Sequence, residues 1–365
     1  MKIFIICNSL GGGGAERVGV NLANGFAEKG HLVSIITDVY QPSTYPVIDK
    51  VNIIPFCEKE NGKFKKWSGA IRQIRKATKN ERPDVIIGIM QLCSLAAKIA
   101  VSGLGIPIIM SEHDSFFRPE SFKLTVGEKI SKYHLNKLYD SVTILTEADK
   151  EYIGKRLHNT VVMPNPLTFE TANALPEKEK IILSAGRLSS WHVKGFDLLI
   201  KAWGKVCKEN ANENLNNWRL QIAGDGKPED YNYLKNSAEI NGVAQRTDFL
   251  GYRTDMMDLY KKSSIYVLSS RSEGLPMVVI EAMSQGCAVV AGENYGRTKE
   301  IITNNKEGLL CQMENIDDLA EKIQDMIVNE SYRLEVQKNA IERSKYYSLD
   351  HIVNMWESLI SKTIQ

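Results

Sequence analysis

The sequence predicts an α/β protein made of two doubly wound domains, each with a parallel sheet. Two series of short apolar runs alternate with longer segments of helical spacing, the pattern of strands covered on both faces. A length of 365 residues suits two domains. Between the two series, residues 164–176 contain three prolines and no periodicity, which is typical of a linker.

Each series predicts six buried strands. In the first they are Lys2–Cys7, Leu32–Thr37, Val85–Met90, Ile106–Met110, Val142–Thr146 and Val161–Met163. In the second they are Ile181–Ala185, Arg219–Ala223, Asp248–Leu250, Ile265–Ser269, Ala288–Ala291 and Gly308–Cys311. Helical spacing marks Ala15–Lys29, Phe122–Tyr139 and Leu349–Ile364. We therefore expect domains over residues 1–168 and 177–348, followed by a C-terminal helix over 349–365.

Charge and cysteine content exclude several classes of protein. Basic residues number 46 against 44 acidic ones, and a net charge of +2 does not suggest a nucleic-acid partner. Residues 1–170 hold 22 basic and 17 acidic residues (+5), and the remainder holds 24 and 27 (−3). The six cysteines form no C-x-x-C pair, so zinc and redox motifs are unsupported. No run is apolar enough to span a membrane and Met1–Leu10 is too short for a signal peptide, so we expect a cytoplasmic protein.

Four glycines, Gly11–Gly14, follow the first strand and open the first helix. Glycine lets the backbone approach a ligand and the helix start offers free N–H groups, so the loop suits a phosphate or sugar phosphate. A flexible strand-to-helix turn is the alternative. A dinucleotide site is disfavoured, although Asp38 ends the second strand where a ribose-binding acid would lie. The G-x-G-x-x-G pattern fails because Glu16 or Arg17 falls at its third glycine.

The strongest pattern lies in the second domain, where Glu273 precedes Pro276 in a loop and Glu281 falls in the second turn of the next helix. The helix amides between these acids could meet a diphosphate, and each carboxylate could accept hydrogen bonds from hydroxyls. Two solvated acids at a helix start are the alternative. Arg187 and Lys194 follow another strand and could neutralise the diphosphate. The chain has no D-x-D triplet and no metal-ligand spacing, so we expect no metal requirement.

These motifs together resemble a known family. They are G-G-A-E-R-V at 13–18, G-R-L at 186–188 with K-G at 194–195, A-G-D-G at 223–226, and E-G-L-P-x₄-E-A-M at 273–283. The chain resembles the retaining nucleotide-sugar glycosyltransferases of family 4, of the bacterial surface-polysaccharide type, over almost its whole length. The resemblance implies the GT-B architecture, in which two Rossmann-like domains face a cleft. It also implies that the N-terminal domain, residues 1–168, binds the acceptor and that the C-terminal domain holds the nucleotide-sugar donor. The C-terminal helix would cross back to the N-terminal domain.

The resemblance implies a role for each motif residue of the second domain. Glu281 would bind the nucleotide ribose and Glu273 the hydroxyls of the donor sugar. Arg187 and Lys194 would hold the diphosphate, helped by backbone amides. These amides belong to Gly274 and Leu275. The backbone at Tyr252 and Arg253 would lie by the nucleotide base. One departure weakens the assignment of Lys194: it follows Arg187 by seven residues where the common pattern has five.

In the first domain the resemblance implies that Gly13 and Gly14 approach the phosphate and donor sugar. His113 corresponds to the family's histidine near the reaction centre, and it follows a strand's carboxyl end. Retention in this family is attributed to front-face attack, in which the leaving diphosphate helps deprotonate the acceptor. No protein nucleophile is then required.

The expected reaction moves a hexose or N-acetylhexosamine, with galactose or N-acetylgalactosamine as the guess, from a UDP-sugar to a hydroxyl of a surface glycan. The UDP-sugar is a substrate, so no cofactor is expected. The acceptor would be a growing glycan or a polyprenyl-diphosphate-linked oligosaccharide. Two alternatives are a sugar-nucleotide epimerase on the same architecture and an inactive nucleotide-sugar-binding protein.

Residues 59–82 hold nine basic and two acidic residues, and Phe64, Trp67, Ile71 and Ile74 fall beneath them at helical spacing. A basic amphipathic helix can lie on an anionic membrane, and residues 116–118 (F-F-R) could assist it. This would make the protein peripheral on the inner face of the cell membrane. The alternative is a solvated helix whose apolar stripe packs on its own sheet.

Overall fold

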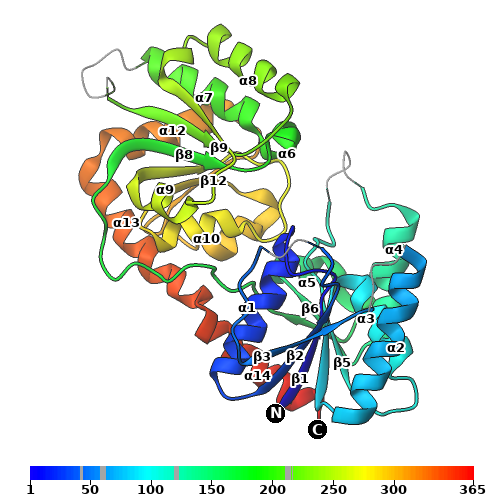
Figure 1. The fold of residues 1–365 in the computed structure, drawn as a ribbon. Helices are drawn as coiled ribbons and strands as arrows, with labels where there is room; N and C mark the ends of the chain where they lie inside the picture. The colour runs from blue at the N-terminus through cyan, green and yellow to red at the C-terminus, as the bar shows by residue number, and fades with distance from the viewer. Residues whose placement is uncertain (42–43, 58–62, 119–122, 210–214, 216) are drawn as a thin grey trace. The chain divides into compact units, whose positions relative to one another are not determined.

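The computed structural model describes residues 1–41, 44–57, 63–118, 123–209, 215 and 217–365. The chain separates into two compact units, Met1–Pro166 with Leu349–Gln365, and Leu167–Ser348 (Figure 1). The division at Pro166 falls inside the proline-containing stretch 164–176. The class predicted from sequence, α/β with doubly wound parallel sheets, is confirmed in both units.

Unit 1 contains a seven-stranded parallel sheet in the order β3-β2-β1-β4-β5-β6-β7. Its strands are β1 Lys2–Ile6, β2 Leu32–Thr37, β3 Val51–Pro55, β4 Val85–Ile89, β5 Ile108–Ser111, β6 Ser141–Ile144 and β7 Thr160–Val162. Sequence analysis missed β3 because it is an edge strand: Asn52 and Ile53 are exposed, so it lacks the continuous apolar run of a buried strand.

The helices of unit 1 cover both faces of this sheet. They are α1 Gly14–Glu28, α2 Lys63–Glu81, α3 Met90–Ala100, α4 Val126–Tyr133, α5 Glu147–Ile153 and α14 Leu349–Thr363. Successive side chains of β1 point to opposite faces, so Ile3 and Ile5 join a core with α1 and α14. Phe4 and Ile6 join a second core with α2 and α3. This alternation makes the sheet doubly wound.

One helix of unit 1 is shorter than predicted, and the C-terminal helix packs on the first helix of the chain. The helix predicted over 122–139 begins at Val126, because Thr125 and Glu128 form a capping box, and it gives way to a 3₁₀ turn at Leu135–Leu138. Residue 122 lies outside the described residues. The C-terminal helix α14 packs on α1 in unit 1, where Trp356 is buried and Lys29 pairs with Asp350 at 2.9 Å (Figure 1, red).

Unit 2 contains a six-stranded parallel sheet in the order β10-β9-β8-β11-β12-β13. Its strands are β8 Glu179–Ala185, β9 Arg219–Ala223, β10 Thr247–Gly251, β11 Ser263–Leu268, β12 Ala288–Gly292 and β13 Leu309–Cys311. Its helices are α6 Trp191–Lys194, α7 Phe196–Glu209, α8 Pro228–Ile240, α9 Met256–Lys262, α10 Met277–Ser284, α11 Arg297–Ile301, α12 Ile316–Val328 and α13 Glu330–Ser344.

Both sheets reverse their strand order at one place, beside β1 in unit 1 and beside β8 in unit 2. Ligands of open α/β sheets bind at the carboxyl ends of strands near such a point. The glycine loop follows β1, Arg187 follows β8, and Glu273 follows β11, the neighbour of β8. The sequence motifs therefore fall where each fold can bind a ligand.

Candidate active site

Lys194 and Glu273 meet at the carboxyl edge of unit 2. After β8 the chain makes a 3₁₀ turn and the short helix α6, which ends at Lys194 because Gly195 takes a left-handed conformation, φ 66°. The Lys194 Nζ donates to Glu273 Oε1 at 2.7 Å, and the side chains are 27% and 12% exposed. Despite the longer spacing from Arg187, the structure thus brings Lys194 to the predicted acid.

Arg271 fixes the segment that carries Lys194. Its Nη1 and Nη2 donate to the two carboxylate oxygens of Asp197 at 2.8 Å each, and its backbone N–H donates to the Val193 carbonyl at 2.8 Å. Its Nε donates to Glu314 at 2.9 Å. Sequence analysis missed this clamp because a charged residue in a loop gives no sign of its partner. The one signal was the position of Arg271, two residues before Glu273.

Glu281 lies in α10 and is 5% exposed. One carboxylate oxygen accepts from the Thr168 hydroxyl at 2.6 Å and the other from the Tyr260 hydroxyl at 3.3 Å. Burial, with the charge of Glu281, raises the pKa of Tyr260 well above its ordinary value, so this hydroxyl keeps its proton. A carboxylate already placed to accept from hydroxyls can accept from those of a ribose. Thr168 was also missed, because it lies in the linker.

The start of α10 presents free backbone amides. Its N-cap, Pro276, makes no capping hydrogen bond from its side chain. In the described part of the chain, no hydrogen bond occupies the N–H of Gly274 or Leu275. Arg187 lies exposed after β8 with no ion pair to another described residue. Two sets of donors, amides and a cation, are therefore available to an anion.

The residues predicted to lie by the base follow β10. The Tyr252 side chain is 75% exposed. The Arg253 Nε donates to Asp255 at 2.8 Å, and this hydrogen bond lowers the pKa of Asp255. Across the described residues, no group of three or more His, Cys, Asp or Glu side chains is arranged to hold a metal ion.

In unit 1 the glycine loop is shaped by its neighbours. Gly12 has φ +93°, and Gly13 is the N-cap of α1 without a side chain to cap it. A Cβ on Gly13 would lie 2.3 Å from the Glu16 carboxylate, so a larger residue there would require the Glu16 side chain to move, whereas Gly14 faces open space. The Tyr45 hydroxyl donates to the Gly13 carbonyl at 3.1 Å and holds the loop.

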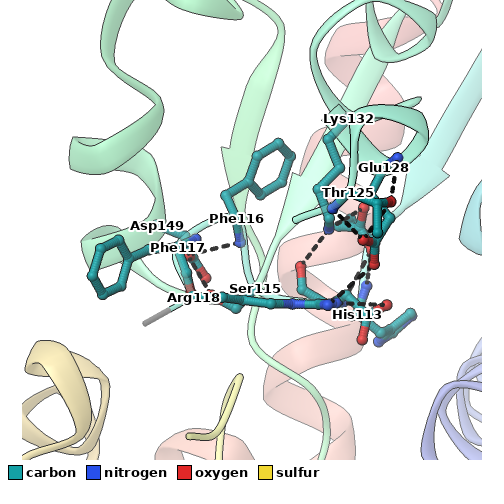
Figure 2. A network of polar contacts seen from close by, with 11 residues as sticks. His113, Ser115, Phe116, Phe117, Arg118, Thr125, Glu128, Lys132 and Asp149 are labelled. Atoms are coloured by element: carbon teal, nitrogen blue, oxygen red, sulfur yellow. Dashed lines mark hydrogen bonds and ion pairs between the residues drawn. The ribbon is translucent and has the colours of Figure 1, made fainter. Parts of the chain in front are cut away.

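Two buried carboxylates organise the loop that carries His113, as Figure 2 shows for the second of them. Glu112 accepts from the backbone N–H groups of His113 and Asp114 at 3.1 and 3.0 Å and pairs with Lys132 at 2.8 Å. Asp149 accepts from the N–H of Phe116 at 3.1 Å. The loop after β5 is therefore held rigidly although it has no regular secondary structure.

His113 itself is neutral at pH 7. Burial lowers its pKa to about 4, more than the nearby Asn165 and Asp114 raise it. Its Nε2 lies 3.0 Å from the Ser111 hydroxyl, and Nδ1 is buried. A neutral ring can exchange a hydrogen bond with a ligand hydroxyl but does not act as a cation.

The structure corrects two expectations about a membrane-binding surface. Phe116 is 1% exposed and belongs to the core, so it cannot contact a lipid. On α2, Ile74 is fully buried and Trp67 packs on Phe56 with 5.6 Å between ring centroids, so the apolar stripe packs on its own sheet. The exposed face still carries Arg72, Lys76 and Lys79. Residues 59–62 and the Phe64 side chain lie outside the described residues. No described helix has the length and apolar character to cross a membrane.

Known families match both units. The sequence model for "Glycosyltransferase Family 4" matches residues 12–170, and that for "Glycosyl transferases group 1" matches residues 168–343. An uncharacterised glycosyltransferase of Haemophilus influenzae is 31% identical over 98% of this chain and 99% of its own length. The chain is a family 4 glycosyltransferase.

Two further likenesses place this glycosyltransferase among better-described proteins. A Campylobacter jejuni α-1,4-N-acetyl-D-galactosaminyltransferase, named for the acceptor GalNAc-α-(1→4)-GalNAc-α-(1→3)-diNAcBac-PP-undecaprenol, is 30% identical over 99% of both chains. The fold is similar to Anabaena HepE in complex with UDP and glucose, with a TM-score of 0.78 at 19% identity over 99% of this chain and 100% of that one. The GT-B architecture of this glycosyltransferase is thereby confirmed.

Proposed function

We propose that this glycosyltransferase moves galactose or N-acetylgalactosamine from a UDP-sugar to a hydroxyl of a growing surface glycan carried on polyprenyl diphosphate, with retention of anomeric configuration. The named activity and acceptor of the Campylobacter relative support the sugar and the lipid-linked acceptor. The UDP bound to HepE supports the nucleotide. Sugar transfer is the activity of the families that match both units, which favours it over epimerisation.

One observation carries the proposal: Lys194, which follows Arg187 after β8, pairs at 2.7 Å with Glu273, which directly precedes the free amides before α10. We assign Arg187, Lys194 and the amides of Gly274 and Leu275 to the diphosphate. Lys194 has three N–H donors, so it can keep its bond to Glu273 while it contacts a phosphate oxygen. Glu273 then accepts from hydroxyls of the donor sugar.

The nucleoside is assigned to the other end of α10. The Glu281 carboxylate accepts from the ribose hydroxyls, as it accepts from those of Thr168 and Tyr260 in the structure. The exposed Tyr252 and the adjoining backbone of Arg253 contact the base. This division puts the anionic part of the donor at the amides and its hydroxyls at the two glutamates.

The transfer itself needs no protein nucleophile in this proposal. The bond from the anomeric carbon to the diphosphate oxygen breaks, the acceptor oxygen bonds to the same face, and the acceptor proton passes to the leaving phosphate. Arg187 and Lys194 supply the positive charge that a metal would otherwise supply. Gly13 and Gly14 admit the phosphate and donor sugar, and the neutral His113 exchanges a hydrogen bond with a sugar hydroxyl near the reaction centre.

We further propose that the enzyme works at the cytoplasmic face of a membrane. The exposed basic side chains of α2, Arg72, Lys76 and Lys79, would attract anionic headgroups. Because the apolar stripe of α2 is packed inside unit 1, this attraction would be electrostatic and would weaken as salt rises.

A donor screen tests the proposed function. UDP release is measured with UDP-galactose, UDP-N-acetylgalactosamine and their gluco epimers, with and without EDTA, and the anomer of the product is assigned by NMR. We expect a galacto donor to be preferred, turnover to survive EDTA and the anomer to be retained. An inverted product would refute retention, and loss of turnover in EDTA would refute metal independence.

A further inference from the structure

Helix α6, Trp191–Lys194, is four residues long and ends at the lysine that the proposed function assigns to the diphosphate. A helix this short is not stable by itself in water, because the cost of nucleation outweighs its few hydrogen bonds. Its N-cap, Ser190, makes no capping hydrogen bond from its side chain. Arg187 and Lys194 are also seven residues apart, where the common pattern of the family has five. Contacts outside α6 must therefore hold Lys194 in place.

Residues at the end of β11 hold the last turn of α6. The Ser269 hydroxyl donates to the Lys194 carbonyl at 3.1 Å, and the backbone N–H of Arg271 donates to the Val193 carbonyl at 2.8 Å. A Cβ on Gly195, which has φ +66°, would lie 1.9 Å from the Ser269 carbonyl oxygen, so only glycine allows this close approach. These contacts fix the end of α6 and not its beginning.

An aromatic stack fixes the beginning of α6. The rings of Trp191 and Tyr233 lie with their centroids 4.1 Å apart and their planes 21° from parallel. Tyr233 belongs to α8, whose Leu234 and Ala238 are buried in the core of unit 2, so its ring has a firm support. Trp191 is half-buried and packs on the same core. The stack therefore ties the segment after β8 to the helix that follows β9.

We propose that Trp191 and Tyr233 are positioning residues for Lys194. Their stack fixes the first residue of α6 and thereby keeps the Lys194 ammonium beside Glu273, where the donor diphosphate would lie. The inference rests on the proposed function, which assigns Lys194 to the diphosphate. A stacked aromatic pair shifts an equilibrium by roughly 2- to 10-fold beyond the effect of the area it buries. Loss of the stack should therefore release Lys194 by a factor in this range.

The first measurement follows Lys194 itself, without ligand. Reductive methylation of each lysine is followed by mass spectrometry in the wild type, Tyr233→Ala, Tyr233→Phe and Tyr332→Ala. Tyr233 is 46% exposed, so its truncation removes no buried side chain. The matched control is Tyr332, which packs on the same core from α13. The internal reference is Lys322, whose side chain is paired and 24% exposed, against 27% for Lys194.

We expect Tyr233→Ala to raise the methylation rate of Lys194 by roughly 2- to 10-fold and to leave that of Lys322 unchanged, because the amine reacts only after it has left Glu273. Tyr233→Phe keeps a ring on Trp191 and should keep the wild-type rate, as should Tyr332→Ala. An unchanged rate at Lys194 in Tyr233→Ala, or an equal rise at Lys322, would overturn the inference.

A double-mutant cycle then separates positioning from general destabilisation. The dissociation constant of UDP is measured by calorimetry for the wild type, Tyr233→Ala, Lys194→Ala and the double variant. Tyr233→Ala should weaken UDP binding by roughly 2- to 10-fold when Lys194 is present and leave it nearly unchanged when Lys194 is absent, because the stack acts through this lysine. An equal effect in both backgrounds would overturn the inference. If Lys194→Ala binds UDP as the wild type does, the proposed role of Lys194 fails, and the methylation rates alone decide whether the stack positions it.

Discussion

The Arg271–Asp197 clamp allows a quantitative test of how the segment proposed to bind the diphosphate is held. Both side chains are about nine-tenths buried, 10% and 9% exposed, and they share two hydrogen bonds of 2.8 Å. Removal of one partner from such a pair leaves a buried charge uncompensated, at a cost of roughly 3–5 kcal/mol. Arg271→Ala should therefore lower the free energy of unfolding of unit 2 by about that amount.

A double-mutant cycle isolates the pair. The free energies of unfolding of the wild type, Arg271→Ala, Asp197→Ala and the double variant are measured by urea titration, following the transition that UDP shifts. The matched control is Arg219–Asp248, which also shares two hydrogen bonds, from Nε and Nη2, but is 46% and 33% exposed. We expect a coupling energy of about 2–3 kcal/mol for the clamp and about 1 kcal/mol or less for the control.

The same variants report on the site. Because Arg271 holds Val193 and Asp197 on either side of Lys194, its loss should weaken UDP binding about tenfold or more, whereas loss of Arg219 should not. A coupling energy no larger than that of the exposed control would refute the argument from burial. Normal UDP affinity in Arg271→Ala would refute the claim that the clamp positions Lys194.

Three further predictions concern other parts of the molecule. Arg187→Ala should cut turnover by roughly 10²–10³, measured as UDP release, and near-normal turnover would remove Arg187 from the site. Because folding lowers the pKa of His113 to about 4, the unfolded chain binds more protons between the unfolded value near 6.5 and 4, so stability falls as pH falls through this window. Between pH 7 and 4, the free energy of unfolding of His113→Gln should fall by roughly 2–3 kcal/mol less than that of the wild type, as measured by urea titration. An equal fall in both proteins would contradict the lowered pKa of His113. Replacing Arg72, Lys76 and Lys79 by Gln should abolish cosedimentation with anionic vesicles, and unchanged binding would dismiss the basic face.

Much of the fold could be predicted because parallel strands are buried on both faces and appear as continuous apolar runs. This worked for β4, Val85–Ile89, and for β11, Ser263–Leu268. It failed for the edge strand β3, whose exposed Asn52 interrupts the run. Sequence analysis also failed for Phe116, which looks exposed in a polar loop but is buried because its ring packs against Tyr133 in the core of unit 1.

Residues of the candidate site could be chosen from sequence, but the side chains that hold them in place could not. The motif residues Lys194 and Glu273 could be chosen from sequence, since both follow strands, and the structure places them 2.7 Å apart. Arg271 and Thr168 could not be chosen from sequence, because each acts through a contact with a residue far along the chain. The partner of Arg271 is 74 positions away, and that of Thr168 is 113 positions away.

The sequence by itself determined the two parallel-sheet units, the strand-end positions of the motifs and the family, because these follow from local patterns of burial and from spacing along the chain. Tertiary structure decided which charges are paired and which are free. Asp38 forms an ion pair with Lys66, whereas the Glu16 carboxylate lines a cavity and has no partner in the described chain. Whether a charged side chain binds a ligand or only its neighbour depends on distances that long-range folding sets, and no local pattern encodes them.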